Sequence, residues 1–362
     1  MRCRYTIIHA LPSDLFSLAV LTFSRLSSSF LGGTPSLARS SLFSGIFEVL
    51  SRHGCQVSEE TEVTMEANPS SYSSSCIISS LGFTRLSMGV QSFDDEILRL
   101  SNRDHNAKDA LKILGTISSG QQLRHGFSFD LMFGFPNQTL ASWKNDLDKA
   151  LPFAQIGRHI SLYELTLEPG TPLHRSVKNG LLQLPNEDLK EEMYDYAVDR
   201  MRQIGIYRYE VSNFGRTSRN NFATWQGVDY IGIGPGAHSR IKGTKGGKTR
   251  IIRIPEPGRW INMVESQGHG TAKSTTISRE EYMEELIVSG LRTVPGVSRQ
   301  TFQECTDRCL DNTLVLNRVQ QLCQDGFLEM FENCDGLEDL DIPSYYNYIK
   351  GGVRATDKGL MV

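Results

Sequence analysis

The sequence of 362 residues has no run of eighteen apolar residues, so it offers no segment that we expect to cross a membrane as a helix. It also has no basic excess: its formal net charge is −3, whereas nucleic-acid-binding proteins usually carry a basic face or surplus. Its seven cysteines are scattered, which argues against a disulfide framework and fits a reducing compartment. With 39% hydrophobic residues, the chain can bury one large core and a smaller domain.

The first thirty residues are poor in acidic side chains. Asp14 is their single acid, while Arg2, Arg4 and Arg25 occur among serines and a short apolar run. This composition is typical of a mitochondrial transit peptide. The alternative is a segment unrelated to the rest of the chain, from an alternative first exon or a faulty gene model, and composition alone leaves both open.

Strand-like and helix-like segments alternate from Glu62 onwards. Alternation of this kind predicts parallel strands with crossover helices, and at this length it favours a complete or partial α/β barrel. The predicted strands are 62–70, 83–93, 127–136, 159–172 and 207–214, with helices at 94–100, 108–117, 140–153 and 186–206. We expect polar residues at the strand ends to form the active face, namely Glu66, Gln91, Asp130, Glu164, Glu168 and Asn213.

Two further segments follow the predicted barrel. Residues 241–274 begin with the basic, glycine-rich stretch "IKGTKGGKTR" and are expected to be a solvated loop or linker. From about Thr275 the apolar spacing of "EEYMEELIVSGLRT" and "TLVLNRVQQLCQDGFLEM" indicates a small helical domain. The predicted boundaries are an atypical segment at 1–30, a core at 31–240, a linker at 241–274 and a C-terminal domain at 275–362.

Two local patterns resemble binding motifs. Cys305 and Cys309 are four residues apart, but no third cysteine follows at ligand spacing, so ordinary thiols are favoured over a metal site. The stretch "GIGPGAHS" at 232–239 resembles a phosphate-binding glycine loop, but a tight backbone turn explains it equally well.

Seven longer motifs occur in one order along the chain: "GGTPS", "MEANPSS", "RLSMGVQSFDDEILRLSNRDH", "DLMFGFPNQT", "SLYELTLEPGTP", "YEVSNF" and "DYIGIGPGAHS". This set resembles radical S-adenosylmethionine (SAM) proteins, and more narrowly the family of oxygen-independent coproporphyrinogen III oxidase and the HemW-type heme chaperone. The resemblance runs from about Leu31 to the C-terminus. It implies a partial (β/α)-barrel of radical SAM type that lacks its first strand, plus a small winged-helix-like α+β domain.

Within that family, the oxidases have "GMDHFA" where this chain has "YEVSNF", so the resemblance is to the heme chaperone. That branch carries a His-Asn-x-x-Tyr-Trp motif associated with heme. In "RNNFATWQG", Asn221 and Trp225 match, but Asn220 and Thr224 replace the histidine and the tyrosine. Imidazole and phenolate are ordinary heme-iron ligands, whereas an amide and an aliphatic hydroxyl are not. We therefore expect a porphyrin to pack against Trp225 without an iron ligand from this stretch.

Two histidines are alternative ligands, His105 and His238, although a hydrogen-bonded pocket role is favoured for both.

The resemblance also implies a SAM site. In the family, a first strand and loop carry Cys-x3-Cys-x2-Cys, which binds a [4Fe–4S] cluster; this chain has no such triplet, and Cys3 alone cannot replace it. By family position, the SAM-binding residues are Gly32, Gly33, Thr34, Glu66, Gln91, Arg103 and Asp130. The alternative is that the glycines merely turn the chain and that Arg103 pairs with Asp130.

The function implied by the resemblance is a heme chaperone-like protein that binds heme and transfers it to acceptor proteins, without oxidase activity. The alternatives are a radical SAM enzyme of the coproporphyrinogen III oxidase type and an inactive, truncated isoform. The expected location is mitochondrial, with the cytoplasm as alternative. A dimer is left open.

Overall fold

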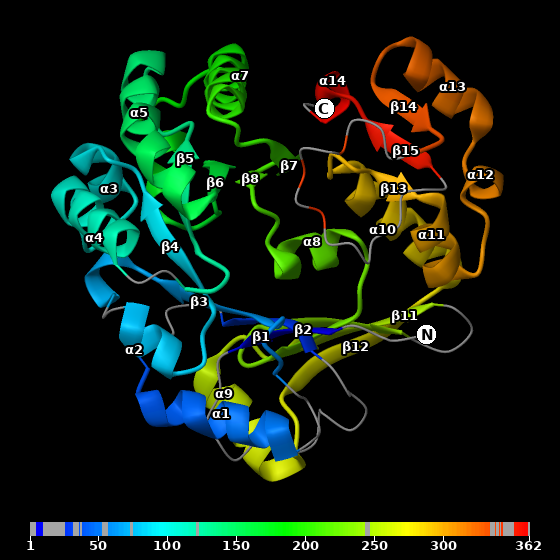
Figure 1. Cartoon of the computed structure of the whole chain (residues 1–362), viewed down its shortest axis with the longest axis horizontal. Coiled ribbons are helices and arrows are strands. Elements are labelled where there is room, and N and C mark those ends of the chain that lie inside the picture. The colour runs from blue at the N-terminus through cyan, green and yellow to red at the C-terminus, as the bar shows by residue number, and fades with distance from the viewer. Residues whose placement is uncertain are drawn as a thin grey trace. The chain divides into compact units, whose positions relative to one another are not determined.

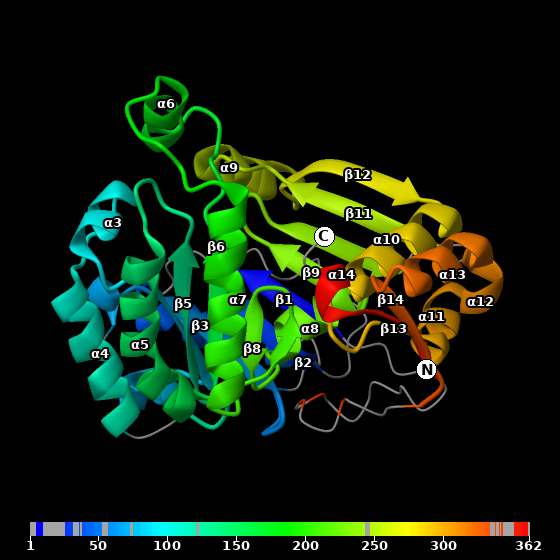
Figure 2. The ribbon, with the colours of Figure 1, turned by 90° about the horizontal axis from the view of Figure 1, so that it is seen from above.

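A computed structural model describes most of the chain. The described residues are 5–9, 26–31, 36, 38–52, 57–72, 75–120, 123–242, 247–333, 337, 340, 342 and 351–360. They form two compact units, the first made of Met1–Met65, Tyr209–Val211 and Thr217–Val362, the second of Glu66–Arg208 and Ser212–Arg216. Figures 1 and 2 show their elements from two directions. No helix among the described residues has the length and apolar character needed to cross a membrane.

The second unit is built on three adjacent parallel strands, β4 (Arg85–Gln91), β5 (Phe127–Phe133) and β6 (His159–Glu164). A short strand, β8 (Asn213–Gly215), pairs antiparallel with β6. The helical elements are η2 (Pro69–Ser71), α2 (Ser75–Ser80), α3 (Asp95–Leu100), α4 (Ala107–Ser119), α5 (Leu140–Gly157), α6 (Pro172–Lys178) and α7 (Glu187–Gln203). The predicted strand–helix alternation of this region is confirmed.

One face of these strands forms the core of the second unit. Along β5, Phe127, Phe129, Leu131 and Phe133 are buried and alternate with Ser128, Asp130 and Met132. Helices α4, α5 and α7 lie on the same side of the strands in Figure 1. The indole of Trp143 is fully buried and donates its N–H to the carbonyl of Met193 at 2.8 Å, which joins α5 to α7. The opposite face of β5 carries its two polar side chains, Ser128 and Asp130, together with Met132.

The first unit contains a mixed sheet in the order β12-β11-β10-β9-β1-β2-β3. The strands β9, β1, β2 and β3 are parallel, while β10, β11 and β12 run antiparallel to their neighbours. The strands are β1 (Tyr5–His9), β2 (Leu26–Leu31), β3 (Glu62–Ala67), β9 (Tyr230–Ile233), β10 (His238–Lys242), β11 (Lys248–Arg253) and β12 (Thr271–Ile277). Strand β3 and the short β7 (Arg208–Glu210) cross the division between the units.

Helices cover both faces of this sheet. In Figure 1, α8 (Arg219–Trp225) lies on one side of β1 and β2, and α1 (Ser40–Arg52) lies on the other side with α9 (Pro257–Gln267). The C-terminal elements are α10 (Arg279–Leu291), β13 (Val297–Ser298), α11 (Arg299–Thr306), α12 (Leu310–Thr313), α13 (Leu316–Gln324), β14 (Leu328–Phe331), β15 (Gly352–Ala355) and α14 (Asp357–Leu360). The strands β13, β15 and β14 form a small antiparallel sheet.

Three expectations from the sequence need correction. The barrel was expected to lack its first strand, but β1 is present and pairs in parallel with both β9 and β2. The expected linker at 241–274 instead supplies β11, α9 and most of β12, because the basic residues lie on strands that pair as antiparallel neighbours. The stretch "YRYEVSNF" forms two short strands because a turn at Val211 and Ser212 interrupts it, and the second strand is antiparallel.

The two local patterns are now explained. Helix α11 ends at Thr306, where Asp307 takes a left-handed conformation, so Cys305 and Cys309 do not share a helix. The "GIGPGAHS" stretch forms the turn between the antiparallel strands β9 and β10.

Candidate functional site

A row of facing residues crosses the strands of the second unit. Gly89 on β4 pairs with Asp130 on β5, Asp130 pairs with Ser161 on β6, and Ser161 pairs with Asn213 on β8. Paired residues of neighbouring strands project to the same face of a sheet. This face is the one opposite Phe129 and Leu131, and thus opposite the helices. The row brings two of the predicted site residues, Asp130 and Asn213, into line.

Asp130 has an unusual electrostatic environment. Burial raises the pKa of its carboxyl to about 6, against the opposing effects of a hydrogen bond with Ser161 and the positive charges of Arg85 and Arg103. Part of the residue remains accessible, but the protein surrounds the carboxyl closely enough for desolvation to dominate. Arg85 is itself buried and donates to the hydroxyl of Ser128 at 2.8 Å.

Arg103 lies near this carboxylate. It follows the turn after α3, is half-buried, and has a pKa lowered by burial, an effect that Asp130 and Asp104 oppose. Its Nε is buried and has no hydrogen-bond partner in the described part of the chain. The charges of Arg103 and Asp130 thus influence each other, and the guanidinium retains an unused donor.

Gln91 ends β4 in a left-handed conformation, with φ of 72°, after an irregularity in the β4–β5 register. Its side chain approaches the backbone of Gly89. A Cβ at position 89 would lie 3.0 Å from Gln91 Nε2 and 3.2 Å from Asn68 Oδ1, so a larger residue would displace both amides. Glu66 is half-buried on β3, two residues before Asn68.

The other predicted residues are placed differently. Glu164 is exposed at the end of β6 and forms an ion pair with Lys190 at 2.9 Å, and Glu168 is exposed in the following loop. Gly32, Gly33 and Thr34 lie outside the described residues. His105 is buried and donates from Nε2 to the carbonyl of Val90 at 3.1 Å, whereas His238 is exposed at the start of β10.

His159 is a residue that sequence reasoning missed. It is buried, and its Nδ1 donates to the carbonyl of Arg216 at 2.6 Å. Burial and the nearby charge of Arg85 lower its pKa to about 3, so the ring is neutral. Its Nε2 lies 3.0 Å from Asn213 Oδ1. Because the neutral ring already donates from Nδ1, Nε2 is an acceptor, and the amide of Asn213 donates to it from Nδ2–H once its O and N positions are exchanged. The asparagine of the "SNF" signature therefore holds a buried histidine.

The heme-associated stretch forms α8 of the first unit. Its first turn is fixed by the buried carboxylate of Glu62 on β3, which accepts from the Ser218 hydroxyl and from the backbone N–H of Arg219, both at 3.3 Å. Asn220 is buried, and its Oδ1 has no hydrogen-bond partner among the described residues. Thr224 is exposed and donates to the carbonyl of Asn220 at 3.0 Å.

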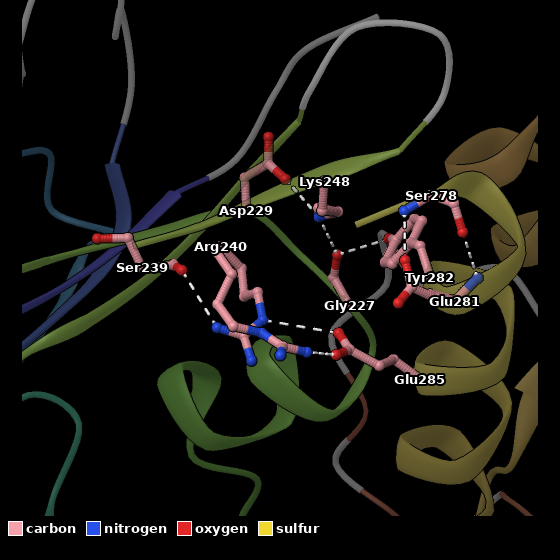
Figure 3. A network of polar contacts seen from close by, with 10 residues as sticks. Gly227, Asp229, Ser239, Arg240, Lys248, Ser278, Glu281, Tyr282 and Glu285 are labelled. Atoms are coloured by element: carbon pink, nitrogen blue, oxygen red, sulfur yellow. Dashed lines mark hydrogen bonds and ion pairs between the residues drawn. The ribbon is translucent and has the colours of Figure 1, made fainter. Parts of the chain in front are cut away.

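A cavity of about 190 Å³ lies beside the C-terminal end of α8. Thr224 and Trp225 of α8 contribute to its lining, and the guanidinium of Arg292 lies 4.9 Å from the centre of the Trp225 ring. The remaining lining comes from β9, β10, β11 and α10, whose polar contacts are drawn in Figure 3. Of the charged residues of this lining, Lys248 belongs to the stretch that was expected to be a solvated loop, and Arg240 and Glu285 gave no signal in the sequence.

The class of protein follows from comparison with known families and structures. Residues 25–150 match the model of the radical SAM superfamily. The chain is 40% identical to radical S-adenosyl methionine domain-containing protein 1, mitochondrial, of Bos taurus, over 76% of this chain and 63% of that protein. It is 38% identical to the protein of the same name from Danio rerio, over 82% and 68% of the two chains. It is 32% identical to the heme chaperone HemW of Bacillus subtilis, over 83% of this chain and 78% of that protein.

The fold agrees with this class. The fold is similar to the structure of coproporphyrinogen III oxidase (HemN) from Escherichia coli, with a TM-score of 0.74 at 18% identity. The similarity covers 99% of this chain and 88% of the HemN chain. The predicted α/β fold of radical SAM type is confirmed. The chain belongs to the radical SAM family that includes HemW and radical SAM domain-containing protein 1. The chain spans 63% of the length of the Bos taurus relative.

Proposed function

We propose that the protein is a heme-binding member of this family that carries heme to acceptor proteins. The observation that supports it most is the 32% identity with a heme chaperone across 78% of that protein's length. The "SNF" signature, in which Asn213 contacts His159, also favours this branch over the oxidase. The second candidate, oxidation of a porphyrinogen, has only the fold likeness to HemN in its favour.

We propose that the polar face of the second unit is a SAM site. Its donor set suits the ligand, since the carboxylates of Glu66 and Asp130 match an ammonium or ribose hydroxyls, and Arg103 has a donor for a carboxylate. Gln91 adds an amide at the same face. When bound and reduced by a cluster, SAM supplies a 5′-deoxyadenosyl radical. Here the residues of the second unit would bind and orient the ligand. The family resemblance also assigns Gly32, Gly33 and Thr34 to SAM, and these three lie outside the described residues.

The residues of this chain fit an iron–sulfur cluster less well than they fit SAM. The segment between β1 and β2, residues 10–25, has no cysteine, although this is where the family's cluster loop follows the first strand. We infer that the cluster site is incomplete, and we assign no radical step to this sequence. In this proposal the SAM site serves regulation of heme binding.

The heme cargo is assigned to α8. Trp225 is half-buried and offers an aromatic face beside the exposed Thr224. The cavity of about 190 Å³ is smaller than the roughly 300–1,000 Å³ of pockets that enclose drug-sized ligands, so the porphyrin would lie against α8 rather than inside it. Without a histidine or tyrosine at 220 or 224, packing and polar contacts carry the affinity.

Location and partners follow from the relatives. The Bos taurus and Danio rerio proteins are named mitochondrial, and we propose the same compartment for this protein, with heme-accepting proteins as its partners. The predicted start of the C-terminal domain near Thr275 and the winged-helix-like character of residues 275–362 are kept as part of this proposal.

Hemin titration followed by absorption tests the assignment. We expect the purified chain to bind hemin saturably and the Trp225→Ala variant to bind it about tenfold or more weakly, because stacking on an aromatic ring is lost. Val288→Ala is the matched control, since Val288 is an exposed apolar side chain of the same unit, 65% accessible and outside the cavity lining. A wild-type chain without saturable binding would refute the function, and equal affinities of all three would refute the placement at α8.

A further inference from the structure

The cavity beside α8 has a lining that combines aromatic rings with cations. Three strands present a row of facing residues to it, because Tyr230 on β9 pairs with Arg240 on β10, and Arg240 pairs with Arg250 on β11. Such paired side chains project to one face of the sheet. Helix α10 packs over this face and supplies Tyr282 and Glu285 to the same lining.

Lys248 is the most buried cation of the cavity, and its charge is already matched within the protein. Its ammonium donates to the carbonyl of Gly227 at 2.8 Å and to the carboxylate of Asp229. It also lies 4.8 Å from the centre of the Tyr282 ring, whose hydroxyl donates to the same Gly227 carbonyl at 3.1 Å. Figure 3 shows this cluster. Lys248 is therefore a structural cation, matched in charge by Asp229 and with two of its three N–H donors in use.

Arg240 is different, because its charge is only partly compensated. Its one ion-pair partner in the described chain, Glu285, is 3.6 Å from Nε and is shared with Arg250, which contacts the other carboxylate oxygen. One acid thus faces two guanidinium groups. Arg240 also donates from Nη1 to the carbonyl of Ser239 at 3.3 Å, which leaves Nη2 without a hydrogen bond among the described residues.

The rest of the lining suits an apolar or aromatic body. Trp225, Tyr230 and Tyr282 contribute rings, and Leu286 contributes an aliphatic side chain. The Tyr230 hydroxyl makes no hydrogen bond with a described residue, so a second donor stands next to Arg240 on the neighbouring strand. The volume of about 190 Å³ equals that of roughly six waters, which is room for a small molecule or for one arm of a larger ligand.

We propose that this cavity binds a carboxylate group carried on an apolar or aromatic body, with the Arg240 guanidinium as its ionic partner and the Tyr230 hydroxyl as a second donor. A guanidinium offers two parallel N–H groups to a carboxylate, and Arg240 retains such donors at Nη2. The carboxylate comes either from a side arm of the porphyrin, in which case the inference rests on the proposed function, or from a free small aromatic acid. Trp225 lines the cavity and belongs to the assigned heme surface, so one ligand can reach both.

Two ligand pairs distinguish the sources. Hemin is compared with hemin dimethyl ester, which keeps the ring and loses the carboxylates, and benzoate is compared with benzamide by saturation-transfer NMR. Each is tested with the wild type, Arg240→Gln, Tyr230→Phe and the control Lys242→Gln. Lys242 is exposed on the same strand and is outside the lining, so the control removes the same charge. Circular dichroism of each variant verifies folding, and Tyr230→Phe tests the site by loss of a single hydroxyl.

We expect Arg240→Gln to weaken binding of the carboxylate ligand about tenfold to a hundredfold and Lys242→Gln to leave it within about twofold, because a charge-assisted hydrogen bond is lost only in the former. If Arg240→Gln weakens the binding of hemin but not of hemin dimethyl ester, the carboxylate that binds in the cavity is a side arm of the porphyrin. Arg240-dependent benzoate binding by a chain that does not bind hemin supports the cavity while the proposed function fails. If neither hemin nor benzoate distinguishes Arg240→Gln from the control, the proposal is wrong.

Discussion

At the scale of single residues, Asp130 makes the free energy of unfolding depend on pH, and this dependence can be measured. Its pKa of about 6 lies above the value of about 3.9 for an unfolded aspartate, so the native state holds more protons between these limits. The free energy of unfolding therefore falls as pH rises from about 4 to about 6. The loss is at most about 3 kcal/mol, since one pKa unit corresponds to about 1.4 kcal/mol.

Asp130→Asn should remove this dependence and make the protein more stable than the wild type at pH 7. Urea unfolding at pH 4.5 and at pH 7 measures it, with Asp148→Asn as control because Asp148 is exposed on α5. A variant whose stability follows the wild-type pH curve would show that Asp130 is not the group responsible.

Gly227 occupies a position that favours glycine. Its φ is +70°, and a Cβ there would lie 2.6 Å from Leu286 Cδ1. We expect Gly227→Ala to destabilise the protein by about 1–3 kcal/mol. Gly180→Ala is the matched comparison, since Gly180 has φ of +71° with open space around it. Its cost therefore measures the backbone strain alone, without a contact such as that with Leu286. Equal melting temperatures of the two variants would mean that the Leu286 contact contributes nothing.

Thr224 is where the family's tyrosine is replaced, and its exposed position allows the residue to be restored. Thr224→Tyr should tighten hemin binding and move the Soret band towards that of a ligated heme, because a phenolate can ligate iron. Absorption titration measures both, with Thr276→Tyr on the exposed part of β12 as control. An identical spectrum and affinity in all three proteins would place iron ligation elsewhere.

At the scale of elements, α8 depends on a residue distant in sequence. Glu62 accepts hydrogen bonds from three groups at the start of the helix, the hydroxyl of Ser218 and the backbone N–H groups of Arg219 and Asn220. In Glu62→Gln the amide N–H₂ would face these donors, so we expect a loss of about 1–3 kcal/mol and faster amide exchange in α8. Hydrogen exchange of α8 against that of α9 measures it, with the exposed Glu265→Gln as control. Unchanged exchange in α8 would contradict this role.

The elements also show what sequence reasoning can reach. The strands β3 to β6 and the helices α3 to α5 and α7 have regular apolar periodicity and clear caps, such as Asp94 before α3, and they were predicted. The strand β11 was missed because Lys248 and Arg250 are polar, and only the pairing with β10 and the acids of other elements explains their burial. His159 was missed because its partners, Asn213 and the Arg216 carbonyl, are more than fifty residues away.

At the scale of the whole molecule, the chain keeps the family's fold, and we propose that its cluster site is incomplete. The fold likeness to HemN covers 99% of the chain, and β1 is in place, yet no cysteine follows it before β2. The heme-binding surface proposed at α8 would not depend on a cluster, because the residues that line the adjoining cavity come from α8, the β9–β11 strands and α10. The central claim is therefore that this chain binds heme with no cluster of its own.

Titration of hemin into chain that has been treated with an iron chelator tests this claim most directly. We expect a Soret band that saturates near one hemin per chain, with the same affinity before chelation, after chelation and after anaerobic reconstitution with iron and sulfide. Hemin binding that arises only after reconstitution, together with a [4Fe–4S] signal in electron paramagnetic resonance on reduction, would contradict it, as would the absence of saturable binding in every state.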